Sequence, residues 1–530
     1  MAERLTPPQA LRACVLVTAA LLGLRLLLAS RVGLGDAEAL YVSYALFPQP
    51  GYLDHPGLVG FVARSLGSDG KLPSAWGVHA FTAVLASLVP WIGGLAAHGA
   101  GADLRGVSRT VLALALVPEL ALGLFGLTPD LLLAVTWLGA LGAAAAILRR
   151  NGDVSFLVYL ALGACLGLGI LAKVSAGLLA LAVAVALLGA PGVRTRPMLW
   201  VAALLTGILV WPWVHWEWSQ GLPMFRHRLI STQSEAGLSL RNVGALLGGQ
   251  LLYVTPPFLY GSYRLLQQLR ETRQGDPCSR LLWIATLLPA VVLAALCLWS
   301  RVAEPHWLAP AYLALSLQLG RGATLVRWVT RSAIGVGVAA VALAFAWVGT
   351  DWAPRLPDSI YRARYDLAND LYAWESAAPL LQEAVKEAAV SAGRWPVVVG
   401  PHWIVCAQAQ YALGAGVHVG CATKVPDDFD RWLPRERWRR QPVVLFVSDS
   451  RFEDVRPSDV LPGRIEKSRS RVSIRRGGRV VRTVSVSRLE LPDGLALSAR
   501  QSAAGASRAR PASRINASSV LVSGLPVVSN

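Results

Sequence analysis

Residues 129–148 read PDLLLAVTWLGALGAAAAIL and carry a single charge, at Asp130. A helix of about 20 apolar residues can cross the hydrocarbon core of a bilayer. Similar apolar runs occur at residues 10–30, 76–98, 107–126, 154–172, 174–190, 197–216, 244–263, 281–299, 306–320 and 324–349. The sequence therefore predicts an α-helical polytopic membrane protein with about eleven transmembrane helices.

The composition points the same way. The chain has 530 residues, of which 54% are hydrophobic and 15% are charged, and its mean hydropathy is +0.47. Soluble domains carry about 25% charged residues. The formal net charge of +18 would suit nucleic acid, but the sequence has no helix-turn-helix, zinc-finger or RRM signature. We expect no nucleic-acid partner, and we attribute the positive charge to loops at the membrane surface.

The arginines predict how the chain lies in the membrane. Positive residues gather in cytoplasmic loops. If the N-terminus is cytoplasmic, the connections on that side hold Arg105, Arg109, Arg149, Arg150, Arg194, Arg196, Arg264, Arg270, Arg273, Arg280, Arg321, Arg327 and Arg331. The short connections on the other side, near Thr128, Lys173 and Arg301, are almost bare. The pattern predicts a multi-pass inner or plasma membrane protein with residues 351–530 on the periplasmic, extracytoplasmic side.

Three regions follow along the chain. Residues 1–350 form the predicted transmembrane domain, with long external loops at 31–75 and 217–243. The loop 31–75 contains two amphipathic stretches, at 36–47 and 56–66, that could lie along the membrane surface.

Residues 351–495 are predicted to form a small extracytoplasmic α/β domain, in which 471–486 makes a hairpin turning at Gly477-Gly478. The tail 496–530 is rich in Ser, Ala and Arg, which is typical of a disordered segment. Cys406 and Cys421 both fall in the α/β domain. Sequence alone does not define whether their geometry permits a disulfide.

Two carboxylates follow the first apolar run, in Asp36-Ala37-Glu38. Residues at i and i+2 do not share a helix face, so each could do a different task. One could be a general base while the other orients it or binds a cation. The alternative is structural, because Gly35-Asp36 before an apolar run is also a good helix start.

Further polar residues mark the same predicted side of the membrane. Asp54 and His55 could bind a divalent ion or a phosphate, or form a solvated turn before a helix that starts at Pro56. Asp130 could favour a helix N-terminus, and Lys173 could reach lipid headgroups. The external cations are Arg226, Arg228, Arg301 and His306. Acidic residues and cations together suit group transfer from a phosphate-bearing donor, in which a carboxylate deprotonates the acceptor while cations stabilise the leaving phosphate.

Several segments, in this order, resemble the polytopic glycosyltransferases of the GT-C fold, in particular the bacterial branch related to protein O-mannosyltransferases and aminoarabinose transferases. They are GDAEALY (35–41), YLDHPG (52–57), LTPD (127–130), LAKVS (171–175) and HWLAPAY (306–312). The resemblance covers roughly residues 10–450. The chain departs from the family pattern where Ala37 separates two acids that are usually adjacent, where Gly57 replaces a second proline, and where Val174 replaces an aromatic residue.

The resemblance implies a transferase that takes a sugar from a polyprenyl-phosphate-linked donor and passes it to a lipid, glycan or protein acceptor. It implies Asp36 as the general base, with Glu38 assisting or substituting. Asp54, His55 and Asp130 would orient the acceptor or hold a divalent metal ion, a requirement on which relatives differ. The residues implied in binding the phosphate or substrate are His55, Lys173, Arg226, Arg228, Arg301 and His306.

Two other functions fit the same residues. A transporter or flippase of a lipid-linked molecule would use them to line a pathway. Such proteins tend to show inverted repeats and broken helices at the midplane, whereas the unusual polar residues here gather at one face. The interrupted acidic motif also fits a catalytically inactive membrane scaffold.

Overall fold

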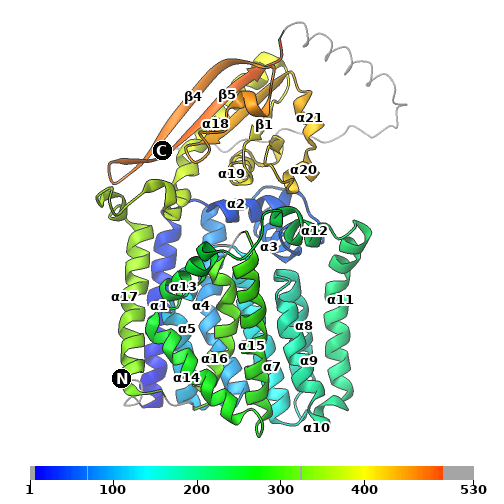
Figure 1. Cartoon of the computed structure of the whole chain (residues 1–530), viewed down its shortest axis with the longest axis vertical. Coiled ribbons are helices and arrows are strands. Elements are labelled where there is room, and N and C mark those ends of the chain that lie inside the picture. The colour runs from blue at the N-terminus through cyan, green and yellow to red at the C-terminus, as the bar shows by residue number, and fades with distance from the viewer. Residues whose placement is uncertain (1–5, 69, 302–303, 323–324, 493–530) are drawn as a thin grey trace.

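The computed structural model describes residues 6–68, 70–301, 304–322 and 325–492. A bundle of helices occupies residues 7–349, and a smaller unit of helices and strands sits on one end of it (Figure 1). The first helix, α1, begins at the other end of the bundle. The predicted disordered tail, 496–530, lies outside the described residues.

Six helices of the described chain are long and apolar enough to cross a membrane. They are α1 (Pro7–Ala29), α4 (Ala75–Gly99), α7 (Pro129–Arg149), α11 (Pro197–Ser219), α15 (Pro277–Trp299) and α17 (Arg327–Gly349). The shorter helices of the bundle are α5 (Leu104–Leu116), α8 (Phe156–Ala172), α9 (Ala176–Leu188), α13 (Leu240–Tyr253), α14 (Pro256–Thr272) and α16 (Ala309–Gly320). The polytopic helical fold is confirmed, whereas the number of eleven spans stays a prediction.

The helices differ in how deeply they are buried. α7 packs against α4, α8 and α16, and its Trp137, Leu138 and Leu141 are almost fully enclosed. α11 and α17 instead expose large apolar side chains such as Leu204 and Leu343. Apolar side chains facing outward are stable where lipid takes the place of water. α7 therefore forms the centre of the bundle.

One predicted span is interrupted. The run 244–263 is split between α13 and α14, which meet at Thr255, a residue with φ of 70°. Pro256 and Pro257 follow directly. A proline disfavours helical geometry in the residue before it and offers no backbone N–H. The single helix predicted across 244–263 was therefore wrong, and the Thr-Pro-Pro sequence was the signal for the break.

A second predicted span, 107–126, also ends early. α5 stops at Leu116, and Pro118 opens the one-turn helix α6 (Pro118–Ala121). The buried guanidinium of Arg25, on α1, donates hydrogen bonds to the carbonyls of Leu120 and Ala121 at the end of α6. These bonds satisfy carbonyl groups that a broken helix leaves unpaired.

The two long loops contain short helices that lie between the bundle and the C-terminal unit. The stretches 36–47 and 56–66 of loop 31–75 contain α2 (Asp36–Ser43) and α3 (Leu58–Leu66). α2 packs against α19 (Trp403–Leu413) of the C-terminal unit, and a position along the membrane surface stays a prediction. Loop 217–243 contains α12 (Pro223–Leu229). Figure 1 shows α2, α3 and α12 along the upper end of the bundle.

The C-terminal unit contains a five-stranded sheet in the order β2-β1-β3-β5-β4. β1 (Val397–Gly400) runs parallel to β2 (Val419–Cys421) and β3 (Val443–Asp449), while β5 (Arg479–Glu490) is antiparallel to β3 and to β4 (Ile465–Arg476). The hairpin at Gly477-Gly478 is confirmed, with both glycines at positive φ. The remaining helices are α18 (Asp370–Ala392), α19 (Trp403–Leu413), α20 (Asp428–Trp432), α21 (Arg435–Arg439) and α22 (Pro457–Val460).

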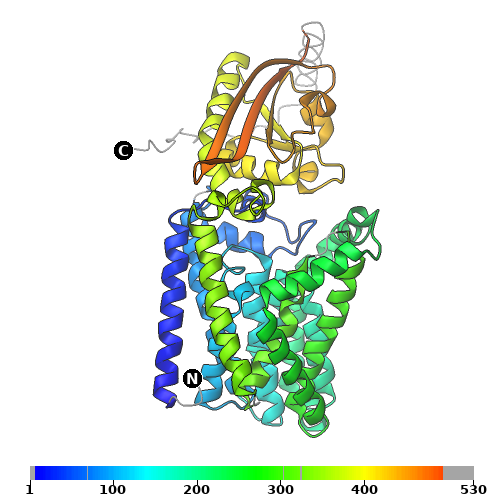
Figure 2. The same ribbon diagram turned by 60° about the vertical axis from the view of Figure 1, so that its left-hand side comes forward.

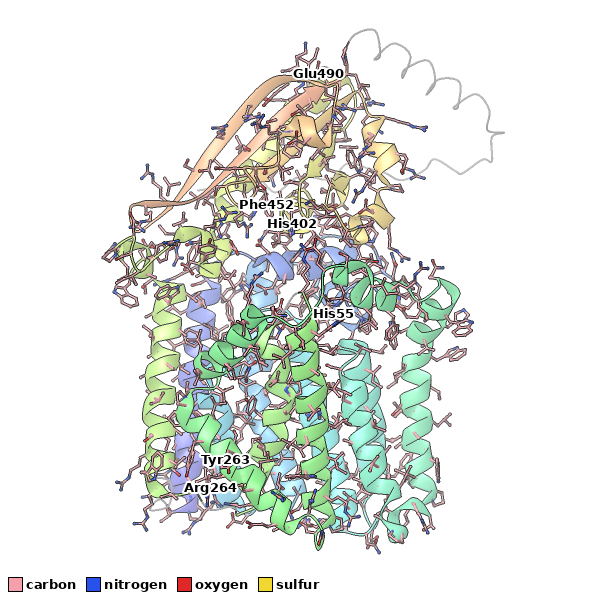
Figure 3. All side chains as sticks on the ribbon, viewed as in Figure 1. His55, Tyr263, Arg264, His402, Phe452 and Glu490 are labelled. Carbon is pink, nitrogen blue, oxygen red and sulfur yellow. The ribbon has the colours of Figure 1, made fainter. Side chains whose placement is uncertain are left out.

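Figures 1 and 2 show this unit stacked on the end of the bundle that carries α2. In Figure 3, His55 and His402 lie at that end, while Tyr263 and Arg264 lie near the opposite one. Arg264 belongs to the set of arginines that the sequence predicts to be cytoplasmic. The fold thus separates this arginine from the C-terminal unit by the length of the bundle.

Candidate functional site

Asp36 begins α2 and faces the C-terminal unit. Its Oδ1 accepts a hydrogen bond from Gln408 on α19 (3.0 Å), and its Oδ2 accepts one from Arg451 (2.6 Å). The same guanidinium pairs with Asp449 at 2.6 Å and with Asp370 at 3.1 Å. Burial, and next the charge of Asp36, raise the pKa of Asp370 to about 7. Asp36 therefore lies in an interface network of carboxylates grouped around Arg451.

Glu38 lies in the first turn of α2, and its buried carboxylate has several hydrogen-bond partners. Its carboxylate accepts hydrogen bonds from the backbone N–H of Gly35 (3.0 Å) and of Leu127 (2.8 Å), and it pairs with His79 Nε2 at 3.1 Å. The bond to Gly35 caps the first turn of α2. This is the helix-start role that the sequence left open, performed by Glu38. The contact with Leu127 also ties α2 to the segment that leads into α7.

Asp54 and His55 occupy a turn that α12 covers. Asp54 Oδ1 accepts a hydrogen bond from Arg228 at 3.2 Å, and His227 Nε2 lies 3.9 Å from the same oxygen. His55 is buried, with its ring edge-on to Tyr41. Burial, and next the positive charge of Lys173, lower the pKa of His55 to about 3, so this imidazole is neutral at physiological pH.

Asp130 and Lys173 form an ion pair at the start of α7. Lys173 Nζ donates to Asp130 Oδ1 across 2.8 Å, and His306 Nε2 lies 3.8 Å from Asp130 Oδ2. His306 Nδ1 lies 3.2 Å from Glu304. His55 feels the charges of both ion pairs, Asp54–Arg228 and Asp130–Lys173. The two ion pairs therefore belong to one group. We call this group the mouth cluster: Asp54, His55, Asp130, Lys173, Arg228, Glu304 and His306.

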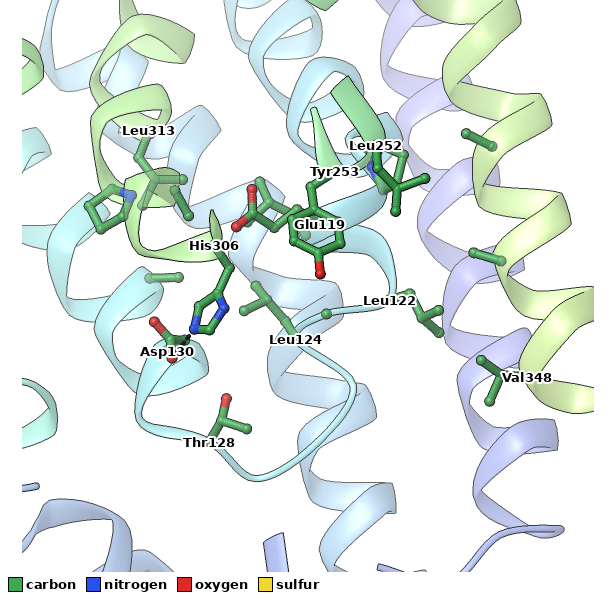
Figure 4. Close-up of a pocket in the computed structure, with 18 of the residues that line it drawn as sticks. Glu119, Leu122, Leu124, Thr128, Asp130, Leu252, Tyr253, His306, Leu313 and Val348 are labelled. Atoms are coloured by element: carbon green, nitrogen blue, oxygen red, sulfur yellow. Dashed lines mark ion pairs between the residues drawn. The ribbon is translucent and has the colours of Figure 1, made fainter. Parts of the chain in front are cut away.

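A cavity of about 720 Å³ opens beside the mouth cluster. Its wall is mostly apolar and is built by α6, α7, α13, α16 and α17. Figure 4 shows Asp130 and His306 as an ion pair on this wall, with Glu119 and Tyr253 on the same cavity. An apolar cavity with a few polar groups at one end suits an amphipathic ligand whose head binds at the cluster and whose tail enters the bundle.

Four of the predicted site residues lie apart from the mouth cluster. Within the described chain, no hydrogen bond or ion pair joins the side chains of Asp36 or Glu38 to it. Arg226 is exposed on α12. Arg301 is also exposed and pairs with Glu235 at 3.3 Å. The structure thus brings together side chains from five separate segments of the sequence: Asp54 with His55, Asp130, Lys173, Arg228 and His306.

The metal ion stays a prediction. Among the described residues, no three His, Cys, Asp or Glu side chains converge as a metal site would require. Asp54 and Asp130, the predicted ligands, each have a cation as neighbour, Arg228 and Lys173 respectively. The donor set therefore fits an anion-binding mouth better than a dedicated metal cage.

The sequence analysis missed some residues. Arg451 and Gln408 hold Asp36 from the C-terminal unit, and nothing in their local sequence signalled this. Glu119 lines the cavity, and its Oε1 is buried with no hydrogen-bond partner in the described structure. A carboxylate beside Pro118 within an apolar run could have been singled out, because ionisable residues at membrane depth are often functional.

A family model described as dolichyl-phosphate-mannose-protein mannosyltransferase matches residues 76–216. Among solved structures, ArnT from Cupriavidus metallidurans bound to undecaprenyl phosphate aligns over 90% of this chain and 97% of its own, with 15% sequence identity and a TM-score of 0.58. The chain has the GT-C fold. The alignment covers nearly the full length of ArnT, so the two chains share their overall fold.

The S. cerevisiae protein O-mannosyltransferase Pmt1-Pmt2 complex bound to the sugar donor aligns over 41% of this chain and 33% of its own, with 13% identity. Its TM-score of 0.29 is too low for a comparison of folds. No curated protein sequence matches the chain significantly. The GT-C fold is therefore established from shape rather than from sequence identity.

Proposed function

We propose that the protein is a membrane glycosyltransferase that transfers a sugar from a polyprenyl-phosphate-linked donor to an extracytoplasmic lipid, glycan or protein. The observation that supports it best is the mouth cluster, with its two cations, at the polar end of an apolar cavity of about 720 Å³ in a GT-C fold. The structural relative ArnT is described as bound to undecaprenyl phosphate. A lipid of that class has the head and tail that this cavity suits.

The chemistry follows from the charges. The acceptor hydroxyl attacks the anomeric carbon, the bond from that carbon to the phosphate oxygen breaks, and the phosphate leaves with the electron pair. Lys173 and Arg228 stabilise the negative charge on the leaving phosphate. A carboxylate takes the proton from the hydroxyl. No other group has to be supplied.

The contacts rank the candidate bases. Both oxygens of Asp36 already accept hydrogen bonds, from Gln408 and Arg451. Asp54 is 30% exposed, and within the described chain its contacts all fall on Oδ1, so Oδ2 is free to receive a proton. This supports Asp54 ahead of Asp36 as the base, with Glu38 as a structural residue.

Sugar transfer from a polyprenyl-phosphate donor in membranes tests the function. Variants D54N, D36A, E38A and the double variant D36A/E38A are compared after correction for the amount of folded protein. We expect D54N to abolish transfer and D36A to retain part of it. If all four variants transferred sugar as the wild type does, the proposed function would be wrong. If D36A alone abolished it, the base would be Asp36.

Controls separate the alternatives. A transporter would move the donor across sealed vesicles without breaking the glycosidic bond, and a scaffold would do neither. Transfer that a chelator abolishes and a divalent ion restores would support the predicted metal. Mass analysis of envelope glycolipids and glycoproteins, with and without the protein, would identify the sugar and the acceptor.

The orientation is part of the same proposal. Arg264 lies near the end of the bundle away from the C-terminal unit, and arginines are enriched on the cytoplasmic side. This supports an extracytoplasmic C-terminal unit, next to the donor's head group.

A further inference from the structure

Two cysteines of the C-terminal unit face each other. Cys406 lies on α19 and Cys421 ends β2, and their sulfur atoms are 2.7 Å apart. Neither side chain is exposed to solvent. A disulfide bond joins sulfurs at about 2.05 Å. Closing this pair therefore needs only a small movement of two side chains.

The packing around the pair holds the two sulfurs together, with the carboxylate of Asp427 as a further neighbour of Cys421. Gly400 on β1 pairs with Cys421 in the sheet, and a Cβ at position 400 would lie 2.8 Å from the sulfur of Cys406. Because Gly400 has no side chain, α19 can pack with Cys406 directly against the strands. Within the described residues no third His, Cys, Asp or Glu converges with the two cysteines to make a metal site. The geometry fits a covalent bond between the two sulfurs.

We propose that Cys406 and Cys421 form a disulfide bond in the mature protein and that this bond fastens α19 to β2. The proposal rests on the extracytoplasmic placement of the C-terminal unit in the proposed function, because disulfides form and persist in oxidising compartments. The oxidant is the disulfide of a thiol–disulfide oxidoreductase.

The exchange has two steps. One cysteine, as thiolate, attacks a sulfur of the oxidoreductase and gives a mixed disulfide. The second cysteine then attacks the first and releases the oxidoreductase as a dithiol, which carries away two electrons and two protons. Burial raises the pKa of Cys406 in the folded protein and screens both sulfurs from a partner. The exchange therefore takes place before α19 packs onto the sheet.

The bond acts on the site through α19. Two residues after Cys406, the amide of Gln408 donates hydrogen bonds to the carbonyl of Leu34 (2.9 Å) and to Asp36 (3.0 Å). These contacts hold the start of α2 against the C-terminal unit. A disulfide at Cys406 fixes the helix that makes them.

Thiol mapping on the full chain in native membranes tests the bond directly. Membranes are dissolved in SDS with N-ethylmaleimide, with or without prior reduction, and digested for peptide mass analysis. Without reduction we expect no label on Cys406 or Cys421 and a cross-linked peptide pair lacking two hydrogens. The bundle cysteines Cys14, Cys165, Cys278 and Cys297 serve as internal controls and take the label in both samples. Labelling of Cys406 and Cys421 without reduction would overturn the proposal.

Thermal unfolding tests whether the disulfide between α19 and β2 stabilises the protein. We expect reductant to lower the unfolding temperature of the wild type and of the control variant C165A, but not that of C406A/C421A. A wild-type unfolding temperature that stays unchanged after thiol labelling shows the bond to be reduced contradicts the proposal. Protease digestion of a C-terminal tag in spheroplasts, in which the outer membrane no longer shields the periplasmic face, reports the placement separately. Free thiols with an external tag would refute the disulfide alone, whereas free thiols with a protected tag would also refute the placement in the proposed function.

Discussion

Arg451 Nη1 donates a hydrogen bond to Asp36 Oδ2 across 2.6 Å and thereby joins the C-terminal unit to the first loop of the bundle. Removing one member of a buried ion network leaves the others uncompensated. We expect Arg451→Ala to destabilise the docked C-terminal unit by about 3 kcal/mol. Limited proteolysis and thermal unfolding in detergent measure this. Arg469→Ala, which breaks a more exposed pair with Glu466, is the matched control and should have little effect. Equal behaviour of the two variants would contradict the network's role.

Glu38→Ala should act on folding before it acts on catalysis. It removes the acceptor for the N–H groups of Gly35 and Leu127 and the partner of His79. Each buried donor left unsatisfied costs about 1–3 kcal/mol. We expect a large loss of monodisperse protein by size-exclusion chromatography. The control is Glu387→Ala, at an exposed site on α18. A stable but inactive Glu38→Ala protein would instead support a catalytic role.

Asp428 should make stability depend on pH. Burial, and next the negative charge of Asp54, raise its pKa to about 8, from 3.8 in an exposed aspartate. The folded state thus keeps a proton that the unfolded chain releases, so this contribution to stability is complete below about pH 4 and is lost as pH rises through 8. Asp428→Asn cannot ionise. We expect its stability relative to the wild type to increase steadily from pH 5 to pH 8 in denaturant titrations, and parallel pH profiles would refute this.

Lys173→Met should remove most of the transfer activity. The ammonium group donates a hydrogen bond across 2.8 Å to Asp130, which lines the cavity, and in the proposed mechanism it stabilises the leaving phosphate. Loss of one group that stabilises developing charge lowers rates by about 100-fold or more. The rate of sugar transfer per folded molecule checks this. Lys386→Met, on the exposed face of α18, should leave the rate unchanged.

Gly57→Ala should destabilise the turn that presents Asp54. A Cβ at this position would lie 2.6 Å from the carbonyl oxygen of Pro50 and 2.8 Å from that of Gln49. Such overpacking costs about 1–3 kcal/mol. Gly177→Ala, where a Cβ meets no atom within 4 Å, is the control in thermal unfolding. A hydrogen bond at Gly57 also explains why this chain lacks the second proline of the family pattern. The N–H of Gly57 donates to the carbonyl of Pro50, and a proline has no N–H to donate.

The sequence predicted what depends on local composition. Apolar runs such as α7 form helices because only a helix satisfies the backbone within lipid. The break at Thr255 was missed, although Pro256-Pro257 signalled it. The shared location of Asp130, Lys173 and His306 followed from counting spans. The contacts themselves did not follow, because the pairing of Lys173 with Asp130 depends on how two helices pack.

Asp36 shows most clearly that long-range contacts could not be predicted from the sequence. Its partner Arg451 lies 415 positions further along the chain. No periodicity or motif relates the two residues, since a docking interface is defined only once both units have folded. The sequence therefore identified Asp36 as unusual, but the interface around it emerged only from the structure.

Trp347 connects the cavity to the C-terminal unit. It lines the cavity from α17, and its indole N–H donates a hydrogen bond to Asp366, just before α18. Arg476, in the β4–β5 hairpin, donates to the carbonyls of Val348 and Thr350 at the end of the same helix. One wall of the cavity is thus mechanically continuous with the C-terminal unit. A tilt of the C-terminal unit would therefore also move α17, so the shape of the cavity depends on the position of that unit.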